Sequence, residues 1–335
     1  MTEKVKFEIS ITTILKIVLT LVAVYLLYLI KDVIVVLFIA FILIAAFHPV
    51  VRSWSRFIGR VPAVLILVIL GLGAITGFGF LIVPAFVTQI GQLFESLPSL
   101  VTKAHLLRQY FPSLQENLQT LTSSAGSLTG SVVKVTFSVI GGIAAFIMII
   151  FITVYALLDE TVLSKSLTAL VPADIKEAVL NVVRKVFVKI GDWLRGQLFL
   201  GLVMGIMAYI AYSLIGLPYA LTLAVIAGMT EILPVIGPIV AGALALLVAS
   251  QISWLAVILV LVVTIVMHQL EGNLLLPKIM QKAIGLPPVI ILVAILIGTK
   301  LIGVLGALLA VPIVGILYVL IQEWPTIKKI SQNAD

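Results

Sequence analysis

The sequence contains no cysteine, three histidines and few charged residues. Charged side chains make up 10% of its 335 residues, whereas about 25% is usual for a soluble domain. The absence of cysteine excludes disulfides, thiolate metal sites and cysteine nucleophiles. The histidines, His48, His105 and His268, are too far apart in the sequence to indicate a metal centre, so no metal site is expected.

The sequence also lacks the common signatures of enzymes. It has no His-Glu-x-x-His zinc pattern, no Gly-x-Ser-x-Gly elbow, no Gly-x-x-x-x-Gly-Lys-Ser/Thr loop and no Gly-x-Gly-x-x-Gly pattern. We therefore expect neither an enzyme nor a bound cofactor. Without a nucleotide-binding loop, any pumping must be driven by a gradient.

Apolar side chains dominate what is present. They account for 62% of the residues, against about 45–50% in ordinary domains. Runs of about 20 apolar residues, each long enough to cross a hydrocarbon core about 30 Å thick, recur along the chain. The predicted spans of normal length cover residues 11–30, 33–47, 61–83, 135–158, 194–214 and 252–270. The pattern predicts an all-α polytopic membrane protein.

The net charge of +7 indicates how the chain is oriented in the membrane, because the basic residues lie in short stretches between apolar runs. A nucleic-acid partner is therefore not expected. Most of the 21 Lys and Arg residues fall in residues 2–16, 52–60, 165–195, 278–282 and 328–329. Placing these on the inside predicts a bacterial-type inner (plasma) membrane protein with both termini in the cytoplasm.

Composition divides the chain into five regions. Residues 86–134 are amphipathic and should lie outside the cell, and residues 159–193 form a second polar segment on the cytoplasmic side. The predicted regions are the N-terminal spans (1–85), the outer amphipathic segment (86–134), the fourth span with the cytoplasmic segment (135–193), a transport unit (194–322) and a cytoplasmic tail (323–335).

The C-terminal half contains an internal repeat. The string Ile-Gly-Leu-Pro begins at Ile215 and again at Ile284, 69 residues later, and Pro-Ile-Val follows each copy, at Pro238 and at Pro312. Because loops between apolar helices favour Gly and Pro, the first match alone could arise from turn preference. The later Pro-Ile-Val match is not explained in that way, so we interpret the two units as a repeat.

Each repeat unit contains apolar pieces that are short for membrane spans. Residues 219–230 and 288–298 would rise only about 18 Å as helices. They predict two re-entrant helical hairpins, with tips at 231–238 and 299–306, that line one cavity. One span precedes each hairpin, so the second copy should be inverted, an arrangement typical of secondary transporters. The expected total is about eight membrane segments.

Glu231 is the leading candidate for a functional residue. It stands between two apolar pieces beside Pro234, Gly237 and Pro238, which free backbone carbonyls from helix pairing. A carboxylate with free carbonyls predicts a proton or cation site. The alternative is a glutamate in an ordinary interfacial loop.

Polar residues elsewhere in this half are further candidates for transport or ion coupling. Glu271 and Asn273, before Pro277, could contact substrate or form an interfacial collar. Lys300, between the second hairpin's glycines, could attract an anionic substrate or mark the headgroup region. Arg195 and Gln197 could belong to a gate or anchor a helix at the membrane surface. The remaining candidates are the turn and helix residues Gly303, Gly306 and Pro312.

The chain resembles the autoinducer-2 exporter family of predicted permeases. The resemblance is carried by Gln269-Leu270-Glu271-Gly272-Asn273-Leu274-Leu275-Leu276-Pro277-Lys278, by Gly285-Leu286-Pro287-Pro288 and by Gly303-Val304-Leu305-Gly306 running on to Pro312. Arg195-Gly196-Gln197 and the turn 234–238 are also similar to the family's pattern. The family usually has His where this chain has Pro287, so no side chain can titrate at that position.

The resemblance implies an oligomeric secondary transporter of about eight membrane segments. Family members are linked to export of autoinducer-2 or to sodium/proton exchange. We therefore expect export of a small polar metabolite such as autoinducer-2, with H⁺ or Na⁺ as coupling ion, in a homo-oligomer within the lipid bilayer. A Na⁺/H⁺ antiporter and a passive oligomeric channel remain the alternatives.

Overall fold

The fold is all-α, as the sequence predicts. We analysed a computed structural model, which describes residues 11–77, 132–159, 176–234, 236–280 and 287–332, together with residues 79, 80, 84 and 171. Those residues form helices and short turns and contain no strand. The predicted outer segment 86–134, except for its last three residues, lies outside the described residues, as does the second Ile-Gly-Leu string.

The helices fall into long spans and shorter apolar helices. In chain order they are α1 (Ile11–Leu29), α2 (Lys31–Ile58), the helix Arg60–Gly77, α6 (Val132–Leu158), α8 (Lys176–Ile215), α9 (Ala220–Thr230), α10 (Ile236–Ser250), α11 (Trp254–Leu270), a π-helical turn (Glu271–Leu275), α12 (Leu276–Met280), α13 (Pro288–Ile302) and α14 (Val304–Gln332). Among the described residues, five helices are long and apolar enough to cross a membrane: Lys31–Ile58, Arg60–Gly77, Lys176–Ile215, Trp254–Lys278 and Val304–Pro325. The chain is thus a multi-pass membrane protein, and the total of about eight segments stays a prediction.

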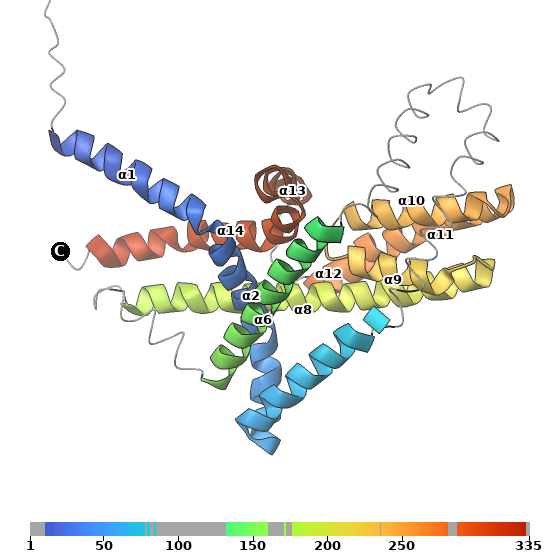
Figure 1. The fold of residues 1–335 in the computed structure, drawn as a ribbon, viewed down its shortest axis with the longest axis horizontal. Coiled ribbons are helices and arrows are strands. Elements are labelled where there is room, and N and C mark those ends of the chain that lie inside the picture. Colours follow the sequence, from blue (N-terminus) through green and yellow to red (C-terminus); the bar gives the residue numbers. More distant parts are fainter. Residues whose placement is uncertain are drawn as a thin grey trace, which may run out of the picture.

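Helix α8 organises the molecule (Figure 1). Its C-terminal half packs with α9, α10 and α11 around one apolar cluster, which includes Leu200, Met204 and Val260. Its N-terminal half packs against α2 and α14. Helix α2 also packs against α6 and Arg60–Gly77. The functional candidates Gln197, Glu231 and Glu271 lie on or beside the C-terminal half of α8.

Helix α2 is longer than the predicted span 33–47. The basic stretch 52–60, expected as a loop between two spans, is mostly helical, because α2 continues through Pro49 to Ile58. Pro49 has no N–H, so it leaves the carbonyl of Ala45 without its usual partner in the helix. Arg195 of α8 supplies that partner, donating from Nη1 to the carbonyl oxygens of Ala46 at 2.7 Å and of Ala45 at 3.3 Å. A tertiary contact thus lets the helix pass the proline.

Helix α9 packs against α10 and α13 packs against α14, at the places where the two hairpins are predicted. The hydroxyl of Thr230 donates to the carbonyl of Ile226 at 2.7 Å. Sixty-nine residues later, the hydroxyl of Thr299 donates to that of Ile295 at the same distance. Thr20, Thr76 and Thr153 make the same bond outside the repeat, so it is an ordinary feature of threonine in a helix. Re-entry and inversion stay predictions.

The second hairpin turns more sharply than the sequence predicts. Instead of an irregular tip over 299–306, helix α13 continues to Ile302, and the chain reverses at Gly303. Gly303 has a φ of +65°, a left-handed conformation that glycine adopts without steric cost. A side chain on Gly306 would overlap the carbonyl of Gly298, so these two glycines let α13 and α14 pack in direct backbone contact.

The hairpins contact each other near their tips. Leu233 and Ile236 of the first hairpin pack against Ile295, Ala307 and Ala310 of the second. This apolar contact fixes the turn that carries Glu231 against α13 and α14.

Candidate functional site

Glu231 is a buried carboxylic acid at the end of α9. It is 2% exposed, one of the largest fully buried side chains among the described residues. Its main-chain carbonyl accepts a hydrogen bond from Nε2 of Gln197, itself 3% exposed. After Pro234, the chain turns back so that the amide of Gly237 donates to the carbonyl of Leu233 at 2.8 Å. Leu233 and Gly237 are thus joined within the turn predicted from Pro and Gly, and Glu231 at its start lies inside the protein.

Glycines bring Glu231 close to α8. A Cβ on Gly201 would lie 2.5 Å from the carbonyl oxygen of Gly228, and one on Gly228 would lie 2.7 Å from that of Gly201. Gly205, one turn further along α8, faces the same part of α9. Small residues spaced by four allow helix backbones to touch in this way. The close crossing of α8 and α9 therefore positions both Gln197 and Glu231.

Glu271 lies where α11 changes from an α-helix to a π-helical turn. The amide of Leu276 donates to the carbonyl of Glu271, five residues earlier, and Pro277 follows without an N–H of its own. Such π-helical turns are rare and occur frequently at functional sites. Asn273 extends the polar surface, because its Nδ2 donates to Oε1 of Gln269 at 3.0 Å. The helix continues through Pro277 to Met280, so the predicted end of this span at residue 270 is wrong.

The carboxyl groups of Glu231 and Glu271 face each other, although 40 residues separate them in the sequence. Their side chains interact with each other, and His268 interacts electrostatically with Glu271. Two carboxylates held side by side in a buried place repel each other when both are charged. The pair can therefore bind a shared proton or a cation.

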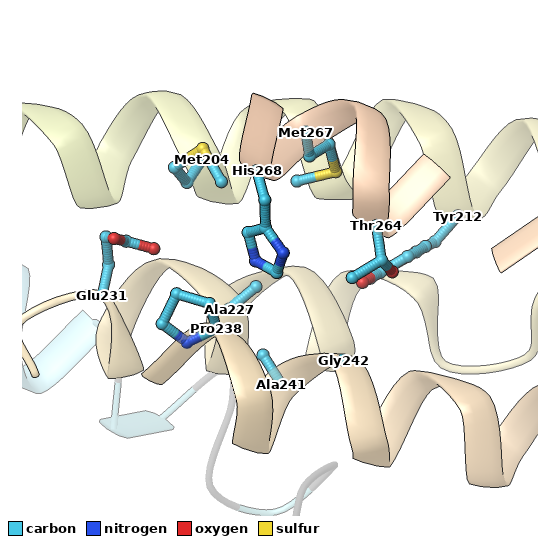
Figure 2. Close-up of a pocket in the computed structure, with 10 residues that line it drawn as sticks. All are labelled: Met204, Tyr212, Ala227, Glu231, Pro238, Ala241, Gly242, Thr264, Met267 and His268. Atoms are coloured by element: carbon cyan, nitrogen blue, oxygen red, sulfur yellow. The ribbon is translucent and has the colours of Figure 1, made fainter. Parts of the chain in front are cut away.

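A small cavity lies beside this carboxyl pair, between α8, the α9–α10 hairpin and α11. Figure 2 shows the carboxyl of Glu231 directed toward the imidazole of His268, with Thr264 and Tyr212 beyond it. The volume is about 20 Å³, which is enough for one water-sized molecule. The lining residues are Met204, Tyr212, Ala227, Glu231, Pro238, Ala241, Gly242, Thr264, Met267 and His268.

The cavity contains only part of the predicted site. Glu231 and Pro238 line it, and Glu271 contacts Glu231. The candidates of the second hairpin, Lys300, Gly303, Gly306 and Pro312, are absent from its lining, so the two hairpin tips do not share this cavity. Lys300 is exposed, whereas Pro312 is buried within α14. Among the described residues, no group of three or more His, Cys, Asp or Glu side chains could hold a metal ion.

Arg195 and Gln197, predicted together as a gate or an anchor, point to different partners. Residues two apart on a helix lie on nearly opposite faces. Gln197 faces Glu231, whereas Arg195 faces α2 and also forms an ion pair with Asp192 at 2.5 Å. Arg195 is therefore a clamp between α2 and α8.

Removing this clamp should destabilise the protein without touching the cavity. Arg195→Met leaves two buried carbonyl groups and Asp192 without their partner, and hydrogen bonds to a charged group are worth about 1.5–3 kcal/mol each. We expect a loss of about 2 kcal/mol or more in stability, measured by thermal unfolding in detergent. Arg195→Lys keeps one charged donor and should lose less. Equal stability of wild type and Arg195→Met would show that the clamp contributes nothing.

Thr264 and Tyr212 were not among the residues singled out from the sequence. The sequence does contain a pattern that could have identified Thr264, because Thr264, His268 and Glu271 follow each other at spacings of four and three residues. That spacing places them on one face of an otherwise apolar helix. Tyr212 comes from a different helix, and no pattern in the sequence connects it to α11.

Comparison with known proteins agrees with these features. Residues 16–326 match the family described as "AI-2E family transporter". The chain is 29% identical over 302 residues to "Putative transport protein YrrI" of Bacillus subtilis, covering 86% of this chain and 84% of that protein. It is 27% identical to "Putative transport protein YueF" of the same organism, covering 82% and 79%, and 24% identical to "Putative permease PerM" of Escherichia coli, covering 83% of each. The chain therefore belongs to the AI-2E transporter family.

Proposed function

We propose that this protein is a secondary transporter in which Glu231 and Glu271 bind the coupling cation. The single observation that carries this proposal is the contact between two carboxyl groups, one of them fully buried, inside a bundle of apolar helices. Ionisable groups within membrane segments are costly to bury and commonly mark ion pathways and proton relays. Membership of a transporter family supports the same conclusion.

The length of the helices around Glu231 supports a position within the bilayer. Helix α9 has 11 residues and α10 has 15, so they rise only about 16 Å and 22 Å, less than a hydrocarbon core of about 30 Å. A turn between two such helices, placed with its outer ends at one surface, reaches the interior of the membrane. A cation bound there must move through the protein to reach the other side.

Two kinds of transported substrate are considered, a small polar metabolite and a cation. We propose export of a small polar metabolite, such as autoinducer-2, driven by H⁺ or Na⁺. Na⁺/H⁺ exchange is the second candidate, and the size of the cavity favours it, since about 20 Å³ admits an ion or a water but no metabolite. Under the first candidate the metabolite would bind in another conformation or at another place.

The orientation in the membrane is proposed from the positions of the basic residues, and the homo-oligomeric assembly from the family. The basic residues Arg184, Lys185 and Lys189 lie in the N-terminal half of α8, and Tyr212 lies near its C-terminal end. With the basic end in the cytoplasm, the outer ends of α9 and α10 face the outside of a bacterial-type inner membrane. A homo-oligomer embedded in the bilayer is the expected assembly.

Glu271→Gln tests whether the two carboxyl groups act as a pair. With one of its two charges removed, the site should attract a cation less strongly, and the apparent affinity for the driving ion should fall about tenfold, equivalent to about 1.4 kcal/mol. The measurement is ion-driven transport in proteoliposomes at a series of H⁺ and Na⁺ concentrations. Glu323→Gln is the matched control, because Glu323 pairs with exposed Lys185 far from the cavity. An unchanged ion affinity in Glu271→Gln would remove Glu271 from the proposed site.

A further inference from the structure

The cavity contains a polar atom that the carboxyl pair does not explain. Oγ1 of Thr264 is buried and has no hydrogen-bond partner among the described residues. The hydroxyl of Tyr212 lies beside it and interacts with it, but the geometry of a hydrogen bond is not met (Figure 2). Buried polar groups are usually satisfied by protein or by ordered water, so an unsatisfied hydroxyl at a cavity indicates a small ligand.

The cavity has the size and chemistry of a site for one water. Its volume of about 20 Å³ exceeds the roughly 10–15 Å³ that a single water requires. Buried waters typically form two to four hydrogen bonds, and four polar side chains line this cavity: Tyr212, Glu231, Thr264 and His268. Hard divalent cations take about six or more oxygen ligands, which this lining of methionines, alanines and few oxygens does not offer.

We propose that the cavity binds one water molecule at Thr264 and Tyr212, and that this water relays protons to Glu231 and Glu271 from the Tyr212 end of α8. The water donates one proton to His268 or a carboxylate as it accepts one from the hydroxyl of Tyr212, which is reprotonated from its other side, so that the water and the tyrosine are both neutral again after each transfer. Three titratable side chains line the cavity: Tyr212 on α8, Glu231 at the α9–α10 turn and His268 on α11. Glu271, on the π-helical turn, interacts with Glu231. The role of the relay in transport rests on the proposed function, whereas the water site does not.

Infrared difference spectroscopy of the full-length protein in lipid can detect the water directly. Spectra are recorded on a change of pH in ordinary water and in water enriched in oxygen-18. A water O–H band that shifts with the oxygen isotope is expected in the wild type. It should disappear in Thr264→Val, which keeps the shape but removes the hydroxyl, and persist in Thr264→Ser.

Proton uptake into proteoliposomes, followed with a pH-sensitive dye, tests the relay. We expect uptake about tenfold slower in Thr264→Val and within about twofold of the wild type in Thr264→Ser. Thr222→Val is the matched control, since Thr222 is buried on α9 but is not part of the cavity lining.

Three results would overturn the inference: no isotope-sensitive band in the wild type, the same band in Thr264→Val, or loss of the band when Na⁺ is added at constant pH. The last would make the cavity a sodium site. Normal transport by a Glu231→Gln variant would instead defeat the proposed function, whereas the water band of the wild type and its loss in Thr264→Val would still establish the water site, so the two failures are distinguishable.

Discussion

Glu231→Gln should fold normally and lose gradient-driven transport. Glutamine has nearly the same shape, and the hydrogen bond that Gln197 donates goes to the main-chain carbonyl of residue 231, which the substitution leaves in place. What is lost is the charge that binds the cation. Interactions with a charged group are worth about 1.5–3 kcal/mol, so the transport rate should fall about ten- to hundredfold.

Companion variants separate loss of charge from loss of structure. Glu231→Asp keeps the charge but withdraws it by one methylene, and should retain partial transport with a changed pH dependence. Glu323→Gln removes a carboxylate that pairs with Lys185 and is not part of the cavity lining, and it should transport like the wild type. Transport at the wild-type rate by both Glu231 variants across the pH range would show that Glu231 takes no part in ion coupling.

Gly201→Val should strongly destabilise the fold of the transport unit. A Cβ at this position lies 2.5 Å from the carbonyl oxygen of Gly228 and 3.7 Å from the Cβ of Glu231. Backbone cannot move aside as a flexible side chain can, so α9 must separate from α8. Overpacking of cores costs about 1–3 kcal/mol and occasionally more, and we expect the upper end of this range.

Thermal unfolding of the purified protein measures this loss, and transport should fall with it because Glu231 moves as well. Gly142→Val is the matched control, since a Cβ on Gly142 meets no atom within 4 Å. It introduces the same β-branched residue into another apolar helix and should unfold close to the wild type. Similar unfolding of the two variants would contradict the close crossing of α8 and α9.

The sequence predicts best those features that depend on local composition. The apolar runs fix the helical class, and an acid between Pro and Gly marks Glu231 without any tertiary information. The hairpin pieces are recognisable because Gly and Pro interrupt them. These signals are local, since each concerns only residues within a few turns of one another.

Features that depend on tertiary contacts could not be predicted in the same way. The continuation of α2 through Pro49 requires Arg195, which is almost 150 residues away in the chain. The contact of Glu231 with Glu271 requires both the Gly201–Gly228 crossing and the π-helical turn. Whether a helix ends at a proline or continues through it thus depends on contacts with residues that are distant in the sequence.

Ion-driven transport by the purified protein is the most direct test of coupling at the carboxyl pair. Wild type and Glu231→Gln are reconstituted in proteoliposomes, and a proton gradient and a sodium gradient are imposed separately while ion movement is recorded. If the carboxyl pair couples transport, one of these gradients drives uptake of the coupled ion or substrate against its own gradient, dissipating the driving gradient stops this uptake, and Glu231→Gln lacks it. Passive flux that never exceeds equilibrium and is the same in both proteins would rule out coupling at the carboxyl pair and indicate a channel.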